Sequence, residues 1–259
     1  MQAVLFTFLG IHLYSYGLMI ALAFLAGYWL ISKVAMRFGE NPEPYLASAL
    51  WFIIAGIAGA RLFYFFWYPQ LFWANPVRAV FNQGGLVWYG GLIGVILAIL
   101  LYTRLRKMPI LHFMDVLSPA AALGLGIGRI GCFLAGCCYG SVTRLPWAVH
   151  FPLSHETHGL PVHPVQLYET VLMGLTCLVL LKLGEKPRPA GFIAFLFLMS
   201  TSLVRFLLEY LRGDRLLWMG ALDLSASQII SLVGFTAGSA LFWMVNQRAH
   251  GKKKSLASG

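Results

Sequence analysis

The stretch GFIAFLFLMSTSLVRFLLEY, residues 191–210, decides the fold class, because it combines apolar length with internal charge. Its length is about that of a helix that crosses the hydrocarbon core of a bilayer. Arg205 and Glu209 are the charged residues within it. An arginine at the centre of a span costs about 2.5–3.5 kcal/mol, so it needs an internal partner or a function. We therefore expect a membrane-spanning helix whose charged residues are either paired inside the protein or functional.

The composition of the whole chain agrees with a lipid-exposed surface. The 259 residues are 59% hydrophobic and only 11% charged, whereas soluble domains are about 45–50% apolar and about 25% charged. The net charge of +10 would suggest a nucleic-acid partner in a soluble protein. In a membrane protein, excess Lys and Arg concentrate in cytoplasmic loops, so we expect no nucleic-acid partner.

Seven segments have the apolar length of a transmembrane helix. The predicted fold is therefore an all-α integral membrane protein of about seven transmembrane helices, forming a single polytopic domain over residues 1–259. The segment from Val116 is the least regular, because it is rich in glycine and contains Pro119. The predicted spans are Tyr14–Val34, Leu46–Trp67, Leu86–Tyr102, Val116–Ala135, Val165–Leu183, Gly191–Tyr210 and Ala226–Val245.

The basic residues predict the orientation of these spans. Of the 19 Lys and Arg residues, most fall on one side of the membrane in this arrangement. The other side receives only Arg78, Arg144, Arg212 and Arg215. Because basic loops stay in the cytoplasm, we expect a periplasmic N-terminus and a cytoplasmic C-terminus. The longest polar excursion, Cys138–His163, is then periplasmic.

Three arginines fall inside predicted spans, namely Arg61, Arg129 and Arg205. A structural ion pair inside the bundle is the simplest explanation for any one of them, and Arg61 fits it. Arg129 lies in the glycine-rich stretch GLGIGRIGCFLAGCCYG, residues 124–140. Close helix packing explains the glycines, but it does not explain a guanidinium group among them.

The segment RFLLEYLR, residues 205–212, places Arg205, Glu209 and Arg212 at spacings of four and three. These spacings put the three side chains on one face of a helix. One interpretation is a self-neutralising row of ion pairs. The other is a phosphate clamp completed by Arg129, because guanidinium groups bind phosphate oxygens in a bidentate manner.

The segment HPVQLYE, residues 163–169, opens the fifth predicted span. Glu169 enters the membrane about one turn into this helix, so we expect it to pair with an internal partner. His163 lies at the interface and is able to accept a proton, although a capping or surface role is the more common one for such a histidine.

Cys132, Cys137 and Cys138 raise the question of a metal site. Their spacing lacks the second His or Cys pair of common zinc sites, so we expect no metal. The favoured interpretation is that the cysteines are small side chains that fill space in the helix packing. A disulfide among them is an alternative in an oxidising compartment.

Six motifs in this order resemble the prolipoprotein diacylglyceryl transferase family of bacteria. The similarity extends over nearly the whole chain, and the arginine motif GIGRIGCF is its most specific element. The motifs are YSYGLM at 14–19, GARLFY at 59–64, WYGGLIG at 88–94, GIGRIGCF at 126–133, HPVQLYE at 163–169 and RFLLE at 205–209.

The resemblance implies a seven-span enzyme of the bacterial cytoplasmic (inner) membrane, with an active site that faces the periplasm and opens to lipid. It implies transfer of the diacylglyceryl group of phosphatidylglycerol to the thiol of the lipobox cysteine in a preprolipoprotein signal peptide, with release of glycerol-1-phosphate. It implies no cofactor and no metal, and we expect a monomer.

The resemblance, together with the chemistry of the residues, predicts the site residues. Those expected to take part in catalysis are Arg129, Arg205, Tyr16, Glu209, Tyr89 and His163. Those expected to bind substrate are Arg129, Arg205, Arg61, Gly90, Gly91, Gly140, Arg212 and Glu169.

Three positions depart from the family pattern. Tyr89 replaces a histidine of better-known members, Cys132 replaces an asparagine and Cys137 replaces a glutamate. We favour the interpretation that the histidine is not an obligatory base; His163 could otherwise serve in its place. Two other functions stay open, namely a divergent relative that moves a lipid group to another acceptor, and an anion transporter.

Overall fold

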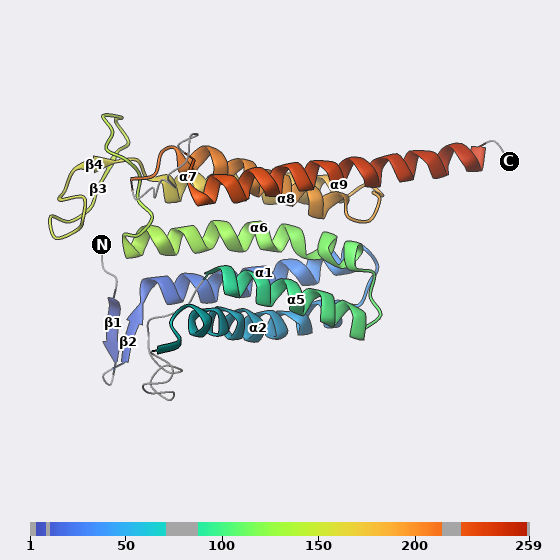
Figure 1. The fold of residues 1–259 in the computed structure, drawn as a ribbon, viewed down its shortest axis with the longest axis horizontal. Helices are drawn as coiled ribbons and strands as arrows, with labels where there is room; N and C mark the ends of the chain where they lie inside the picture. Colours follow the sequence, from blue (N-terminus) through green and yellow to red (C-terminus); the bar gives the residue numbers. More distant parts are fainter. Residues whose placement is uncertain (1–3, 9–10, 71–87, 214–223, 258–259) are drawn as a thin grey trace. The chain divides into compact units, whose positions relative to one another are not determined.

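The structure is a computed structural model that describes residues 4–8, 11–70, 88–213 and 224–257 (Figure 1). The described residues form helices and two small antiparallel hairpins, one of which lies in the long connection of residues 136–164. In chain order the elements are β1 (Val4–Phe8), β2 (Ile11–Tyr14), α1 (Ser15–Arg37), α2 (Glu43–Trp67), α5 (Trp88–Leu105), α6 (Ile110–Ala135), β3 (Val149–His150), β4 (Pro161–Val162), α7 (Val165–Leu183), α8 (Phe192–Glu209) and α9 (Ala226–Ala257).

The predicted all-α membrane fold is confirmed, and the orientation of the termini stays a prediction. Among the described residues, 6 helices are long and apolar enough to cross a membrane: α1, α2, α6, α7, α8 and the first part of α9, to Ala249. The predicted span 86–102 corresponds to α5, of which Gly90–Leu105 forms a shorter apolar helix. The protein is therefore an all-α multi-pass membrane protein.

Several helix boundaries differ from those expected from hydropathy. Helix α6 begins at Ile110 rather than near Val116, directly after Pro109, and proline is favoured at the start of a helix. Helix α9 continues to Ala257 rather than ending near Val245. Hydropathy marks only the part of a helix that contacts hydrocarbon, whereas lysine-rich sequence continues a helix readily in water.

The described chain divides into two compact units, which are considered one at a time. The first unit consists of residues 1–31 and 114–259, and the second of residues 32–113. The single domain expected over residues 1–259 stays a prediction.

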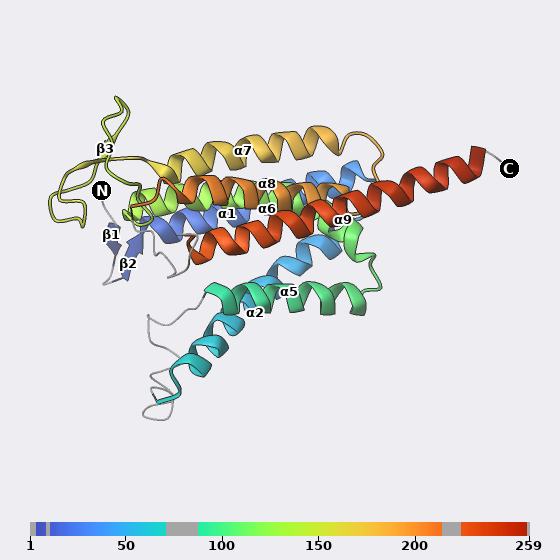
Figure 2. The ribbon, with the colours of Figure 1, turned by 45° about the horizontal axis from the view of Figure 1, so that its top comes forward.

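In the second unit, α2 packs closely against α5 (Figure 2). A methyl group added at Gly59, Gly90 or Gly94 would lie within 3.0 Å of an atom of the facing helix. Small residues allow such close backbone approach, which is a common way to associate helices in lipid. At the other end of the pair, the Tyr102 hydroxyl donates a hydrogen bond of 2.6 Å to the carbonyl oxygen of Pro44.

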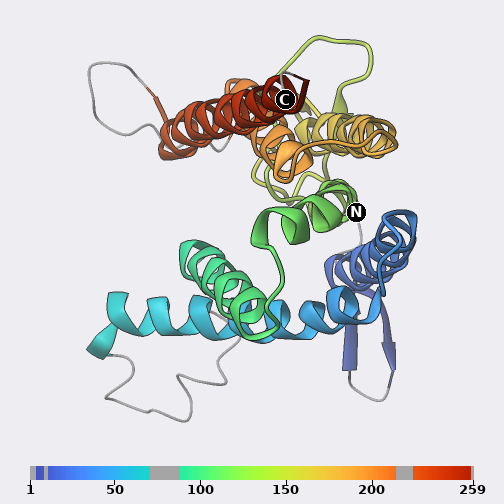
Figure 3. The same ribbon diagram turned by 90° about the vertical axis from the view of Figure 1, so that its right-hand side faces the viewer.

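In the first unit, α8 and α9 lie side by side (Figure 3). Gly234 and Gly238 of α9 face Ser202, Leu198 and Met199 of α8. Helix α7 also packs against α8. Helices α6 and α7 approach at Gly126, whose carbonyl oxygen accepts a hydrogen bond of 3.0 Å from the Thr170 hydroxyl.

The N-terminus of α8 is capped by a carboxylate from another helix. Asp115 of α6, which is buried, accepts hydrogen bonds of 2.7 Å from the Gly191 backbone N–H and 2.8 Å from that of Ala194. The carboxylate satisfies backbone donors that α8 cannot pair internally and complements the positive end of its dipole. Asp115 therefore fixes α8 relative to α6 at the end opposite Arg205.

Candidate active site

Five charged side chains of the first unit form a continuous row of ion pairs, which we call the arginine ladder: Arg129, Glu169, Arg205, Glu209 and Arg212. The Nε atom of Arg129 on α6 lies 2.9 Å from Glu169 Oε1 on α7. The second oxygen of Glu169 lies 3.8 Å from Arg205 Nη1 on α8. Glu209 Oε2 then lies 3.2 Å from Arg205 Nη2 and 3.8 Å from Arg212 Nη1. The ladder thus connects three helices.

Both sequence expectations about these pairs are confirmed. Glu169 has an internal partner, and Glu209 pairs with both Arg205 and Arg212, although α8 ends at Glu209 and Arg212 lies just beyond the helix. The ladder does not neutralise itself, because it contains three arginines and two glutamates. The glutamate side chains are 11% and 5% exposed, whereas those of Arg129 and Arg205 are 21% and 25% exposed. The accessible edge of the ladder is therefore cationic.

Glycines on two faces of α6 determine where Arg129 lies. At Gly126 an added methyl group would lie 3.2 Å from the Thr170 carbonyl oxygen on α7. This close approach brings α7 against α6 and places Glu169, the residue before Thr170, beside Arg129. At Gly131 an added methyl group would lie 3.1 Å from the ring of Tyr16 on α1. Tyr16 therefore packs against the helical turn that follows Arg129.

Gly140 fixes the backbone around Arg212. Its N–H donates a hydrogen bond of 3.0 Å to the His163 carbonyl oxygen, and it pairs with Arg212 in an isolated β-bridge. A methyl group added at Gly140 would lie within 3.0 Å of His163 and Val165. Gly140 is predicted from the sequence to bind substrate. The structure gives it a further role, in which its lack of a side chain lets three chain segments meet.

The side chain of His163 contacts an aromatic pair. Its Nδ1 atom lies 3.4 Å from the Tyr168 hydroxyl, which also accepts a hydrogen bond of 2.7 Å from Trp147 Nε1. The backbone of His163 joins the ladder end through Gly140. The role of His163 as a proton acceptor stays a prediction.

The remaining predicted site residues belong to the second unit. Gly90 and Gly91 face Gly59, Gly56 and Ala60 of α2, and they permit the close packing of α5 against that helix. Arg61 lies on α2. Tyr89 begins α5, and its side chain lies outside the described residues. Substrate contact by these four residues stays a prediction.

Two serines at the start of α9 hydrogen-bond to the ladder, and neither was predicted as a site residue from the sequence. The Ser225 hydroxyl donates a hydrogen bond of 2.9 Å to Glu209 Oε1. Arg205 Nη2 donates one of 3.4 Å to the Ser227 hydroxyl. Ser225 also exchanges hydrogen bonds with Gln228, as in a capping box. The pattern Ser-x-x-Gln before an apolar run is the sequence signal that identifies this helix start.

Cys132, Cys137 and Cys138, which we call the cysteine cluster, lie beside the ladder. Their sulfur atoms are all within 4.8 Å of one another, and Cys132 Sγ lies 4.0 Å from Arg129 Nη1. Hydrogen bonds from the thiols of Cys132 and Cys137, followed by the charges of Arg212 and Arg129, lower the pKa of the Cys138 thiol. Hydrogen bonding to the same two neighbours, Cys132 and Cys138, raises the pKa of the Cys137 thiol.

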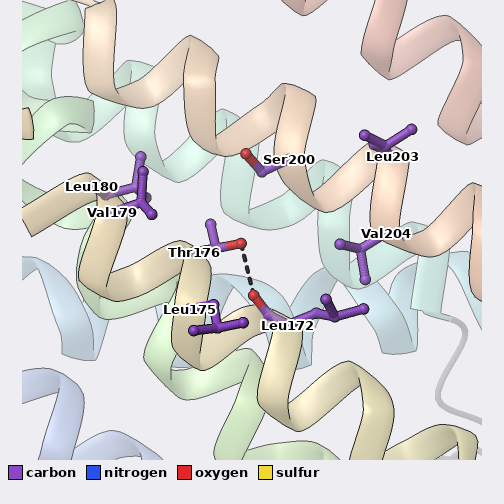
Figure 4. A pocket seen from close by; sticks show the side chains of 8 residues that line it. All are labelled: Leu172, Leu175, Thr176, Val179, Leu180, Ser200, Leu203 and Val204. Atoms are coloured by element: carbon purple, nitrogen blue, oxygen red, sulfur yellow. Dashed lines mark hydrogen bonds between the residues drawn. The ribbon is translucent and has the colours of Figure 1, made fainter.

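An apolar groove of about 250 Å³ runs between α7 and α8 (Figure 4). It begins one helical turn from Glu169, at Leu172, and includes Val204, the neighbour of Arg205. Its other lining residues are Leu175, Thr176, Val179, Leu180, Ser200 and Leu203. Thr176 satisfies its own hydroxyl by donating to the Leu172 carbonyl oxygen, so the groove offers little polarity. Its size and chemistry suit a hydrocarbon chain.

Comparison with known proteins agrees with these features. Residues 3–244 match the family described as prolipoprotein diacylglyceryl transferase. The chain is 36% identical to a phosphatidylglycerol–prolipoprotein diacylglyceryl transferase of Geobacter sulfurreducens, over 91% of this chain and 92% of the relative. It is 36% identical to one of Clostridium tetani, over 93% and 97% of the two chains. It is 37% identical to one of Bordetella avium, over 90% of each. The chain therefore belongs to the prolipoprotein diacylglyceryl transferase family.

Proposed function

We propose that this protein transfers the diacylglyceryl group of phosphatidylglycerol to the thiol of the lipobox cysteine of a preprolipoprotein and releases glycerol-1-phosphate. The observation that carries the proposal is the arginine ladder, in which a cationic edge is held at membrane depth by buried glutamates. The names of the relatives supply the two substrates.

The chemistry of the transfer explains why cations are needed. The acceptor sulfur attacks the glycerol carbon that bears the phosphate ester, and the carbon–oxygen bond breaks. The bonding electrons leave on the phosphate, so negative charge grows there. Donors already oriented toward that position stabilise the transition state without reorganisation, and they act more strongly in a site poor in water.

Arg129 and Arg205 are the residues best placed to bind the phosphate. Both are partly exposed, and Glu169 between them fixes their separation. Because a guanidinium group presents its N–H donors in a rigid fork, each arginine can address two phosphate oxygens. Glu209 and Ser225 hold the charged end of α8 against the start of α9. Glu169 and Glu209 thus position the arginines and offset the repulsion between them.

The α7–α8 groove supports phosphatidylglycerol as the lipid substrate. Its residues follow Glu169 and precede Arg205 along the two helices, so a lipid with its phosphate at the ladder can extend an acyl chain into the groove. Apolar lining of this kind binds hydrocarbon without specific polar contacts.

We further propose that the reaction takes place at the periplasmic side of the cytoplasmic membrane, with the ladder end of the first unit facing outward. The asymmetric distribution of basic residues supports this orientation. We expect the signal peptide of the preprolipoprotein to bind at the active site. We also expect the transferase to act as a monomer.

The experiment that tests the function combines purified protein, phosphatidylglycerol and a lipobox peptide. The expected products are a peptide that carries a diacylglyceryl thioether and free glycerol-1-phosphate, both identified by mass spectrometry. A peptide with serine in place of the cysteine serves as the control and should stay unmodified. Release of glycerol-1-phosphate without a thioether product would contradict the proposed acceptor. It would indicate that this protein is a divergent member of the family that transfers the lipid group to another acceptor.

A further inference from the structure

The cysteine cluster is a chemically distinctive feature that the ladder does not explain. Its three sulfur atoms come from the last turn of α6 and the residues that follow it, and they lie within 4.8 Å of one another. Such convergence was not expected from the sequence, in which two of the cysteines are adjacent.

The backbone explains how the thiols meet. Helix α6 ends in a Schellman motif, in which Gly136 N–H donates to the Phe133 carbonyl oxygen and Cys137 N–H donates to that of Cys132. Gly136 adopts a φ of 79°, which glycine tolerates readily. The motif folds the chain back, so that Cys137 returns over Cys132. Cys138 has a φ of 59° in the same left-handed region.

Neighbouring residues hold this turn in place. Buried Gln166 of α7 donates a hydrogen bond of 2.8 Å from Nε2 to the Cys137 carbonyl oxygen. His155 Nε2 lies 2.7 Å from the Gly136 carbonyl oxygen. Thr157 N–H donates to His155 Nδ1 at 3.1 Å, so the Nε2 atom carries the proton and donates to Gly136. The cluster is thus supported by hydrogen bonds from two separate segments.

We infer that Cys132, Cys137 and Cys138 bind a zinc ion and leave its fourth position open for the thiol of the incoming acceptor cysteine. This inference rests on the proposed function for the identity of the acceptor.

The geometry suits zinc. A tetrahedral zinc ion with Zn–S distances of about 2.3 Å requires sulfur atoms separated by about 3.8 Å. The present separations, at most 4.8 Å, reach that value through small rotations of the thiols. Within the part of the chain that the structure describes, the group contains these three candidate ligands and no fourth. Three protein ligands with one open position are typical of a catalytic zinc site, whereas structural sites are closed by four.

The surroundings also suit this ion. Three thiolates and one zinc ion carry a net charge of −1, and a fourth thiolate raises it to −2, so nearby cations are required. Arg129 lies 4.0 Å from Cys132 Sγ, and Arg212 acts electrostatically on Cys138. Cys137 is exposed, which provides a path for the ion and for the acceptor.

The inferred step balances without a redox change. The acceptor thiol binds zinc and gives its proton to solvent, because a thiol that coordinates zinc is deprotonated. A lone pair of the sulfur then forms the carbon–sulfur bond with the glycerol carbon, while the carbon–oxygen bond breaks and its electrons leave on the phosphate. Zinc stays divalent throughout. The site would supply the thiolate in a chain that has Tyr89 where related enzymes have a histidine.

The test uses full-length protein that has been purified in detergent, reduced and freed of metal. Cobalt(II) is the probe, because thiolate ligands give it intense charge-transfer absorption. We expect wild-type protein to bind one cobalt ion and to lose this ion when a chelator is added. Each of the variants Cys132→Ser, Cys137→Ser and Cys138→Ser should weaken binding by more than ~100-fold, since even losing a residue that supports a ligand costs ~10–100-fold. Cys177→Ser, at the buried cysteine of α7, is the matched control and should bind cobalt as wild type does.

A second measurement tests the open position. Adding a lipobox peptide with cysteine should shift the cobalt absorption bands, and the serine peptide should leave them unchanged. Absence of thiolate–cobalt absorption, or cobalt binding by the three cluster variants as tight as that of wild type, would overturn the metal site. Unchanged bands with the cysteine peptide would overturn acceptor coordination.

Enzyme assays then separate this inference from the proposed function. Full transfer activity in metal-free protein would overturn the role of zinc and leave the function standing. The expected cobalt spectra without any thioether product from phosphatidylglycerol would support the metal site and contradict the function.

Discussion

The carboxylate of Glu169 lies 2.9 Å from Nε of Arg129, although the two residues belong to different helices. The same carboxylate reaches Arg205 on a third helix. One glutamate therefore keeps two guanidinium groups close together at membrane depth, where each would otherwise repel the other.

Glu169→Gln should destabilise the protein strongly, because it leaves Arg129 and Arg205 without the carboxylate between them. Removing one partner of a buried ion pair costs about 3–5 kcal/mol. Thermal unfolding in detergent should show a clear drop in Tm. Glu43→Gln, at an exposed position of the second unit, is the control and should unfold like wild type. Equal stability of the two variants would show that the ladder adds nothing to folding.

Arg129→Ala should abolish most of the transfer activity while the protein still inserts into membranes. Loss of one preorganised donor to a developing oxyanion typically lowers kcat by about 100–1000-fold. The assay is thioether formation on the lipobox peptide. Arg104→Ala, which removes an exposed arginine near the end of α5, should keep normal activity. An Arg129→Ala enzyme with the wild-type rate would refute the phosphate clamp.

Arg205→Lys should also impair transfer, by ~10-fold or more in kcat. Arg205 uses Nη1 toward Glu169 and Nη2 toward Glu209, and a single ammonium group cannot reproduce this fork. The kinetic comparison should include phosphatidylglycerol titration, because a loss confined to KM would indicate ground-state binding alone. Wild-type kinetics in the lysine variant would mean that charge suffices and the fork does not matter.

Gly140→Ala should lower stability by about 1–3 kcal/mol, the usual cost of forcing extra volume into a packed site. The new methyl group would lie within 3.0 Å of the His163 carbonyl oxygen, which is fixed backbone. Gly174→Ala is the matched control, because an added methyl group there meets no described atom within 4 Å. The control should be as stable as wild type or slightly more stable, since alanine favours a helix.

Asp115→Ala should cost about 0.5–2 kcal/mol, because α8 loses the acceptor for its first N–H groups. Asp115→Asn should cost less, since it keeps one acceptor oxygen. Hydrogen exchange at Gly191 and Ala194 would report the loss directly. Unchanged protection of these two amides in the alanine variant would contradict the cap.

Much of the fold could be predicted from hydropathy, because lipid requires about 20 apolar residues per span regardless of tertiary contacts. The pairing of Glu209 with Arg205 and Arg212 was also predictable from their spacing, although α8 ends at Glu209 and Arg212 lies beyond the helix. The contact of Arg129 with Glu169 was not predictable in detail. It depends on the register of α7 against α6, which is fixed by Gly126 and Thr170 in three dimensions.

The cysteine cluster shows the limit of reasoning from spacing most clearly. The spacing of the three cysteines lacks the second His or Cys pair of common zinc sites, and no metal was therefore expected. A Schellman turn, followed by Cys138 in the left-handed backbone conformation, nevertheless brings the three sulfur atoms together. Such a turn is signalled by glycine at position 136, but the left-handed conformation of a cysteine has no sequence signal.

The ladder has a consequence for how the chain enters the bilayer during synthesis. Helices α6, α7 and α8 each carry at least one charge that would cost about 2.5–3.5 kcal/mol if that helix met lipid alone. The pairs that Glu169 makes with Arg129 and Arg205 form only when all three helices are adjacent. We therefore expect insertion of these three segments to be more favourable when they pack together than when each enters lipid separately.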